Sequence, residues 1–301
     1  MGFSGGDKTW VVYQGPPRWD GSDWVNGDRF FLSGHKALQG REGVELAPGV
    51  GGLERGISDY RFDTSANVPG ANRVDEIDGR REIPAAVNIL GKTPREVRAN
   101  KRKWQANHPS GEPGKLWFFS SDGPPRYLRA MKAQEAGAGT IEKEPANRNL
   151  YEKLEWGWTS DDAYFRGYHE SKTLKPLEAG FYGRTFFNTS TVRAIYPVLY
   201  LPGGRWKISR GYRNGFFTTT DIAMNEEIRI DYDPTNSTYI KRNLDTGVIT
   251  NMWPTMVGER PKLSLEAETK NAYSVELVSG DPAQFRSIPR LEFTPMFTSW
   301  V

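Results

Sequence analysis

Turn-forming residues interrupt this chain so often that long helices are excluded over most of its length. Its 301 residues include 32 glycines and 20 prolines, both above the average for a globular protein. Aromatic residues make up 13% of the chain, which is too rich for a disordered protein. Short strands joined by tight turns account for both facts, because aromatic residues favour strands while Gly and Pro favour turns. We therefore predict a mainly β fold.

Charge and cysteine content narrow the class of protein. The 40 basic and 37 acidic residues leave a net charge of +3, so a strongly basic nucleic-acid-binding protein is not indicated. The chain has no cysteine, which excludes disulfides, thiolate nucleophiles and zinc sites built from cysteine. No apolar stretch approaches the length of about 18 residues that a membrane span needs, and no signal peptide is evident. We expect a soluble protein without membrane insertion.

The clearest local pattern is a strand, a helix and a hairpin within residues 83–132. Residues 86–90 predict a strand that ends at Gly91. Thr93, Pro94 and Glu96 then have the spacing of a helix N-cap with a capping box. We expect the helix to run to about Ala106, with Val97, Asn100 and Trp104 buried. Residues 115–120 and 126–132 predict the hairpin that follows.

The other face of this predicted helix is basic. A basic face is commonly a solvated one, but it also suits an acidic partner surface or nucleic acid. We name it as a candidate oligomer or partner interface. Its residues are Arg95, Arg98, Lys101, Arg102 and Lys103.

Residues 133–149 lack apolar periodicity and predict a boundary between two domains, 1–148 and 149–301, with a hairpin arm as the alternative. The first is predicted to be α+β with one helix, and the second an antiparallel β-sandwich. Within the second, the alternation in residues 227–233 predicts a strand with Ile228, Ile230 and Tyr232 inward and its charged residues outward. Asp245 to Gly247 predicts a hairpin turn.

No catalytic, cofactor or metal constellation is indicated. The three histidines are far apart in sequence and match no metal-binding spacing. Asp161 and Asp162 predict either a turn or an acid–base pair, with the turn favoured. Asp245-Thr246-Gly247 resembles an aspartic-protease signature, but that chemistry needs two carboxylates and the chain offers one such tripeptide. We expect neither an enzyme nor a cofactor-dependent protein.

The order of several weak motifs resembles the distal tail (Dit) and minor tail protein family of siphophages that infect actinobacteria. The first half offers Gly43-Val44-x-Leu46-x-Pro48-Gly49, the paired Arg80-Arg81, the capped helix and Asp122-Gly123. The second half offers Trp158 to Phe165 as an entry segment and Ile228-x-Ile230-Asp231 as a sandwich strand. The resemblance spans nearly the whole chain.

This resemblance implies a belt domain at 1–148 and a galectin-like β-sandwich at 149–301. It further implies a homo-oligomeric ring, usually hexameric, in the virion tail tip, assembled in the host cytoplasm. Such a ring joins the tail tube protein to the baseplate hub or tail-associated protein. Its lumen passes the tape measure protein and, in transit, DNA. The family implies no catalytic residues.

Two alternatives remain open at this point. The galectin-like fold suits a carbohydrate-binding adhesion module on the tail tip, with Trp206, Tyr212 and Trp253 as sugar-contact candidates. A weaker alternative is an enzyme that acts through Asp245 or hydrolyses cell walls.

Overall fold

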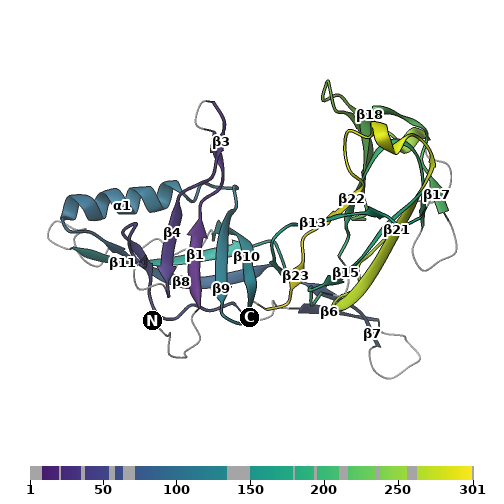
Figure 1. Ribbon diagram of the computed structural model, residues 1–301. Helices are drawn as coiled ribbons and strands as arrows, with labels where there is room; N and C mark the ends of the chain where they lie inside the picture. The colour runs from purple at the N-terminus through teal and green to yellow at the C-terminus, as the bar shows by residue number, and fades with distance from the viewer. Residues whose placement is uncertain are drawn as a thin grey trace, which may run out of the picture. The chain divides into compact units, whose positions relative to one another are not determined.

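The computed structural model confirms a mainly β fold, with one α-helix among the described residues, and the chain divides into two compact units (Figure 1). The first unit holds Met1–Gly167 together with Phe297–Val301, and the second holds Tyr168–Met296. The structure describes residues 9–19, 22–34, 38–53, 58–63, 72–133, 150–178, 180–192, 195–209, 216–234, 238–255 and 263–299.

The first unit is built on an antiparallel sheet. Its described strands follow the order β4-β1-β9-β10-β11-β8-β5, with β12 beside β10 and β23 beside β12. Two hairpins, β2 with β3 and β6 with β7, form small sheets of their own. The strands are β1 (Trp10–Gln14), β2 (Arg18–Trp19), β3 (Trp24–Val25), β4 (Arg29–Ser33), β5 (Val44–Leu46), β6 (Ser58–Asp63), β7 (Asn72–Asp78), β8 (Arg81–Leu90), β9 (Gly114–Ser120), β10 (Gly123–Lys132), β11 (Tyr151–Ser160), β12 (Phe165–Arg166) and β23 (Met296–Phe297).

The helix α1 (Pro94–Ala106) begins and ends where the sequence predicts. The Thr93 hydroxyl accepts a hydrogen bond from the Glu96 amide at 3.2 Å. The Glu96 carboxylate accepts one from the Lys92 amide at 2.7 Å, so the capping box closes one residue earlier than the usual pattern. Val97 and Trp104 are fully buried in the unit's core, as predicted. Asn100 is half-buried, and its amide donates to the Leu90 carbonyl at 2.7 Å.

Replacing Thr93 with alanine is expected to lower the free energy of unfolding of the first unit by about 1 kcal/mol, because the Glu96 amide loses its acceptor. Thr93→Ser keeps the hydroxyl and is expected to retain wild-type stability. Urea denaturation followed by tryptophan fluorescence measures both. Equal stability of the alanine and serine variants would contradict this role for the cap.

The second unit consists of two antiparallel layers that share one long strand, β16. The first half of β16 pairs with β18 and β22, and its second half pairs with β21 and β17. The strand bends at Gly203 and Gly204. A Cβ atom on Gly203 would lie 2.5 Å from the Ala223 carbonyl oxygen, and Gly204 has a φ of +110° that favours glycine.

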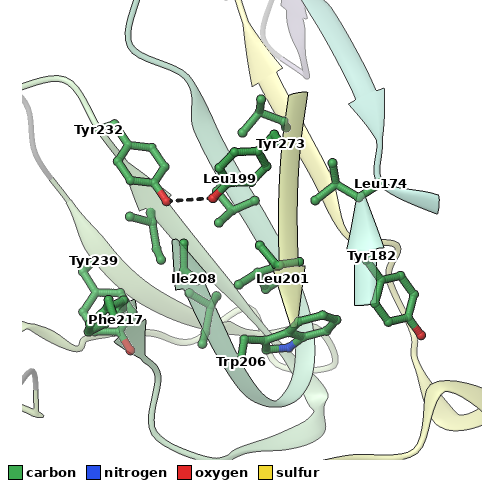
Figure 2. Packing of buried hydrophobic residues seen from close by; sticks show 14 of the residues in the cluster. Leu174, Tyr182, Leu199, Leu201, Trp206, Ile208, Phe217, Tyr232, Tyr239 and Tyr273 are labelled. Atoms are coloured by element: carbon green, nitrogen blue, oxygen red, sulfur yellow. Dashed lines mark hydrogen bonds between the residues drawn. The ribbon is translucent and has the colours of Figure 1, made fainter. Parts of the chain in front are cut away.

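The core of the second unit lies between these layers (Figure 2). Tyr182 and Val275 enter it from one layer, and Leu199 and Ile228 from the other. The elements are β13 (Glu170–Thr173), β14 (Lys175–Pro176), β15 (Phe181–Asn188), β16 (Val198–Ser209), β17 (Phe216–Thr218), β18 (Ile222–Asp231), β19 (Tyr239–Asn243), β20 (Ile249–Asn251), η1 (Trp253–Thr255), β21 (Thr269–Ser279), η2 (Pro282–Gln284) and β22 (Arg290–Phe293).

The alternation predicted for residues 227–233 is half right. Ile228, Ile230 and Tyr232 are buried, as expected. The prediction that the charged residues face outward is wrong for Glu227 and Asp231, which are also buried. Arg290 donates to Glu227 at 2.7 Å and Arg229 to Asp231 at 2.9 Å. Each carboxylate is therefore paired where the sheet covers it, and the pairing of Glu227 with Arg290, 63 residues away in the sequence, is not visible in a local pattern.

The structure divides the chain later than the predicted boundary after residue 148. Strand β11 pairs with β8 along its whole length, from Tyr151↔Leu90 to Ser160↔Arg81. Residues 150–167 therefore complete the first unit's sheet. The chain then returns to the first unit at its C-terminus.

None of the helices in the described part of the chain combines the length and the apolar character needed to cross a membrane.

Candidate assembly surfaces

A cluster of aromatic rings fixes α1 on the sheet of the first unit. The Trp104 ring meets Phe30 edge-on with centroids 5.0 Å apart, and Tyr13 with centroids 5.4 Å apart. The Tyr13 ring also stacks on His108 at 4.1 Å, with an interplanar angle of 7°. Such pairs add directional preference to the burial of apolar surface. The outer face of the helix is therefore held in one orientation.

His108 anchors the end of α1 in its neutral form. Trp158 donates its indole N–H to His108 Nε2 at 3.1 Å, so the ring proton lies on Nδ1 and is donated to the Trp104 carbonyl at 2.8 Å. Burial lowers the pKa of His108 to about 4, the bond to the Trp104 carbonyl opposes this shift, and the charge of Lys132 adds to it. The imidazole is thus a structural hydrogen-bond bridge at neutral pH.

The basic face predicted for the helix is largely exposed. Arg95, Arg98, Arg102 and Lys103 are exposed, and the first three lie at spacings of three and four along α1. Lys101 differs, because it is half-buried and its ammonium contacts the Glu152 carboxylate at 2.5 Å. Four of the five candidate interface residues therefore face outward, and Lys101 ties the helix to β11.

A second surface of the first unit was not predicted from the sequence. The hairpin β2–β3 carries Trp19 and Trp24 with 57% and 66% of their surfaces exposed. The two rings meet edge-on, with centroids 6.0 Å apart. Figure 1 shows this hairpin standing out from the end of α1. The available signal was the occurrence of two tryptophans within a turn segment rich in Gly, Pro and Asp.

Two arginines bind the Asp162 carboxylate, which therefore has a structural role. Its carboxylate accepts two hydrogen bonds from Arg129 and two from Arg166, at 2.7–3.0 Å. Burial alone would raise the pKa of Asp162, but the bonds from these guanidinium groups outweigh it and hold the pKa below its usual value. The side chain therefore stays ionised and lacks the raised pKa of a general acid. Its neighbour Asp161 is exposed.

Two arginines tie the C-terminal segment to the first unit. The guanidinium of Arg81 is buried and donates to the Ala163 carbonyl at 2.8 Å and the Thr298 carbonyl at 3.0 Å. Arg126 lies 4.1 Å above the Phe297 ring and donates to the Ser299 carbonyl at 2.9 Å. The last described residues are thus an integral part of this unit.

The sugar-contact candidates do not form one described surface. Trp206 has no exposed surface, and its indole N–H donates to the Pro202 carbonyl at 2.8 Å, so its ring is not available to a sugar. Trp253 is half-buried against the core and meets Tyr239 edge-on at 5.7 Å. Tyr212 lies outside the described residues. Burial in the core accounts for Trp206 without a ligand.

Asp245 lies in the predicted hairpin turn. Asn243 accepts hydrogen bonds from the Asp245 and Thr246 amides, both at 2.9 Å, and Gly247 has a φ of +73°. The Asp245 carboxylate accepts from Asn225 at 2.8 Å and forms an ion pair with Arg286. Its partners are therefore an amide and a cation, whereas the protease arrangement requires a second carboxylate. Within the described ranges, no three His, Asp or Glu residues gather as a metal site would require.

The two units, their sheets and the helix α1 define a class of fold, and comparison with known proteins identifies it. No protein family model matches the chain. No curated protein matches its sequence either. Among solved structures, the Dit protein of phage SPP1 has this fold, with a TM-score of 0.56 and 12% identity over 96% of this chain and 99% of that chain. That protein is described as a paradigm of the hub adsorption apparatus in phages that infect Gram-positive bacteria.

A chain of the phage P2 baseplate, in its activated conformation with Ca, gives a TM-score of 0.47 at 11% identity over 95% of this chain and 98% of that chain. The fold assignment rests on the SPP1 protein. The resemblance to distal tail proteins predicted from the sequence motifs is thus confirmed at the level of the fold. At 12% identity the roles of individual residues do not transfer.

Proposed function

We propose that this chain is a structural component of a siphophage tail tip, a distal tail protein that assembles into a ring. The observation that carries the proposal is the fold match with SPP1 Dit across nearly the full length of both chains. A match confined to one unit would fit many proteins, because a single β-sandwich supports unrelated functions. A match over both units of one chain is therefore more specific than a match to either unit alone.

In this proposal the first unit is the belt that closes the ring, and the second is the galectin-like domain. The ring, usually hexameric in such proteins, links the tail tube protein to the baseplate hub or tail-associated protein. Its lumen admits the tape measure protein and then DNA. The basic face of α1 belongs to an interface with a neighbouring copy or partner. The protein works through these contacts in the virion and performs no catalysis.

Native mass spectrometry and negative-stain imaging of the purified full chain test the proposal. The expected result is one discrete oligomer whose images show a central hole. A chain that stays monomeric at every concentration, alone and with its tail tube protein, would contradict the proposal that it assembles into a ring.

Charge reversal on the helix tests the contribution of the basic face. The triple variant of Arg95, Arg98 and Arg102 to Glu is expected to weaken ring assembly at least tenfold at low salt, because a complementary acidic surface would become a repelling one. The effect is expected to shrink as salt is added. Native mass spectrometry across a salt series measures it.

The matched control reverses three exposed basic residues of the second unit, Lys175, Arg205 and Lys270. This variant has the same net charge as the helix variant and is expected to assemble like the wild type. Equal assembly of the two variants would remove the helix face from the interface.

A further inference from the structure

The exposed tryptophans of the first unit stand on a hairpin with a fixed base. Trp19 and Trp24 are register partners in the β2–β3 ladder, so both rings leave the same face of the hairpin. At the base, the Gly15 amide donates to the Asp28 carbonyl at 3.0 Å. A Cβ atom on Gly27 would lie 2.4 Å from the Gly15 carbonyl oxygen, so the two strands cross where side chains do not fit. A hairpin anchored in this way presents its rings with little loss of conformational entropy on binding.

The C-terminal end of α1 clamps this base. The Asn107 side chain accepts from the Asp28 amide at 3.2 Å and donates to the Asp28 carboxylate at 3.0 Å. The Tyr13 hydroxyl donates to the Asn107 carbonyl at 2.8 Å, which joins the same point to the buried aromatic cluster. The hairpin and the helix therefore form one rigid feature.

A second exposed apolar patch lies at the other end of α1. Leu150 and Tyr151 are 53% and 48% exposed, and the Leu150 carbonyl accepts from the Gly91 amide at 3.1 Å, just before the helix begins. The Tyr151 hydroxyl donates to Asn88 at 3.0 Å, which holds the ring on the outer face of the sheet. Among the first-unit residues whose side chains the structure describes, the large hydrophobic side chains that are exposed belong to these two patches. The 13-residue helix separates them by about 20 Å.

We propose that the Trp19–Trp24 hairpin of one copy of this chain docks on the Leu150–Tyr151 patch of the next copy, as the head-to-tail contact of the ring. This inference rests on the proposed function, because it names the contact that closes the ring. Two different patches at opposite ends of one rigid feature suit a heterologous contact, in which every copy gives one patch and receives the other. A contact of this kind repeated around an axis covers both patches on every copy.

Charge favours the same pairing. Asp23 is exposed in the hairpin beside Trp24, and Arg18, which is exposed beside Trp19, is paired with Asp28 at 3.6 Å. The exposed charged residues nearest the receiving patch along its two chain segments are Lys92 and Lys153, while Glu152 is half-buried and paired with Lys101. An acidic hairpin tip therefore meets a basic rim around an apolar centre, which is the usual anatomy of a specific interface.

The hairpin is large enough to anchor an interface but too small to form one alone. A stable interface buries about 800 Å² on each partner, more than two indole rings supply. Tryptophans that fill a partner's apolar surface are nevertheless the residues that dominate binding energy in such interfaces. We expect the serine double variant of Trp19 and Trp24 to weaken assembly at least about 30-fold, the size of a single hot-spot residue.

Engineered cysteines test the pairing directly, because the natural chain has none. The full chain is prepared as Trp24→Cys, as Tyr151→Cys and as the double variant, and each is oxidised under assembly conditions. The single variants alone are expected to remain uncrosslinked, and their equimolar mixture to give a covalent dimer. The double variant is expected to give a ladder of disulfide-linked species that ends at the number of copies in the ring. Both positions are exposed, so the variants are expected to fold like the wild type.

The control pairs Trp24→Cys with Ile249→Cys, a position in the second unit that is more exposed than Tyr151 and that the proposal leaves outside the contact. This mixture is expected to stay uncrosslinked. A dimer of Trp24→Cys alone would show a two-fold contact between hairpins and overturn the proposal. Rings that the double variant itself forms without crosslinks would overturn it too, while leaving the proposed function intact. A wild type that forms no oligomer would overturn both.

Discussion

Replacing Trp206 with alanine is expected to lower the free energy of unfolding of the second unit by about 3–5 kcal/mol. The side chain has no exposed surface and packs against Tyr182, with ring centroids 5.4 Å apart (Figure 2). The Phe285 ring lies on it as well, with centroids 5.8 Å apart. Its removal also leaves the Pro202 carbonyl without the indole donor that it accepts from at 2.8 Å. Urea denaturation monitored by circular dichroism measures the loss.

Two comparison variants make this prediction specific. Trp206→Phe fills most of the volume and is expected to lose less stability than the alanine variant. Phe216→Ala removes an aromatic ring that is 60% exposed and is expected to change stability by less than about 1 kcal/mol. Wild-type stability of Trp206→Ala, together with a loss of binding on a glycan array, would restore the adhesion-module alternative.

Acid is expected to destabilise the first unit through His108 before its carboxylates are protonated. The pKa of this imidazole is about 4 in the folded chain, against an ordinary value of 6.5. The unfolded chain therefore binds a proton between these two pH values while the folded chain does not. The free energy of unfolding falls as the pH drops through this window, by about 2 kcal/mol at pH 5 and about 3 kcal/mol at pH 4. Above pH 7 both states are neutral and the contribution vanishes.

Urea titrations at pH 7.5 and pH 5 measure this dependence, with tryptophan fluorescence as the signal, since Trp104 and Trp158 adjoin His108. His108→Gln removes the titrating group, so its free energy of unfolding is expected to fall by about 2 kcal/mol less between pH 7.5 and pH 5 than that of the wild type. The variant is also expected to be less stable than the wild type at both pH values. An unchanged pH dependence in His108→Gln would contradict the assignment.

The helix was the most predictable element, because its signals are local. Thr93, Pro94 and Glu96 define its start, and the proline after His108 defines its end. The exposure of Arg95, Arg98 and Arg102 follows from the helical period alone. The pairing of Lys101 with Glu152 was not predictable, because its partner lies on a strand 51 residues away in the sequence.

The limits of the two units could not be read from the sequence for the same reason. A stretch without apolar periodicity, such as residues 133–149, occurs in sequences inside a unit as well as between units. Only the pairing of β11 with β8 decides that the strand after it belongs to the first unit. The contact of Arg81 with Thr298 joins residues 217 positions apart, and no local pattern signals it.

Burial of single aromatic residues was also beyond the sequence. Trp206 and the pair Trp19 and Trp24 lie in short segments of similar composition, yet the first is fully buried and the others are more than half exposed. The difference arises from the two layers that close over β16, whereas β2 and β3 have only each other as neighbours. Exposure is decided by which strands pair, and pairing is non-local.

The return of the C-terminus makes the second unit an insertion within the first. The chain leaves after β12 and comes back at β23, and these two strands pair with each other. Because β12 and β23 are hydrogen-bonded to each other, the two junctions with the second unit lie side by side in the first unit. Their spacing therefore does not depend on the length of the chain between them. The inserted unit can therefore be lengthened or exchanged at these two junctions while the first unit keeps its fold.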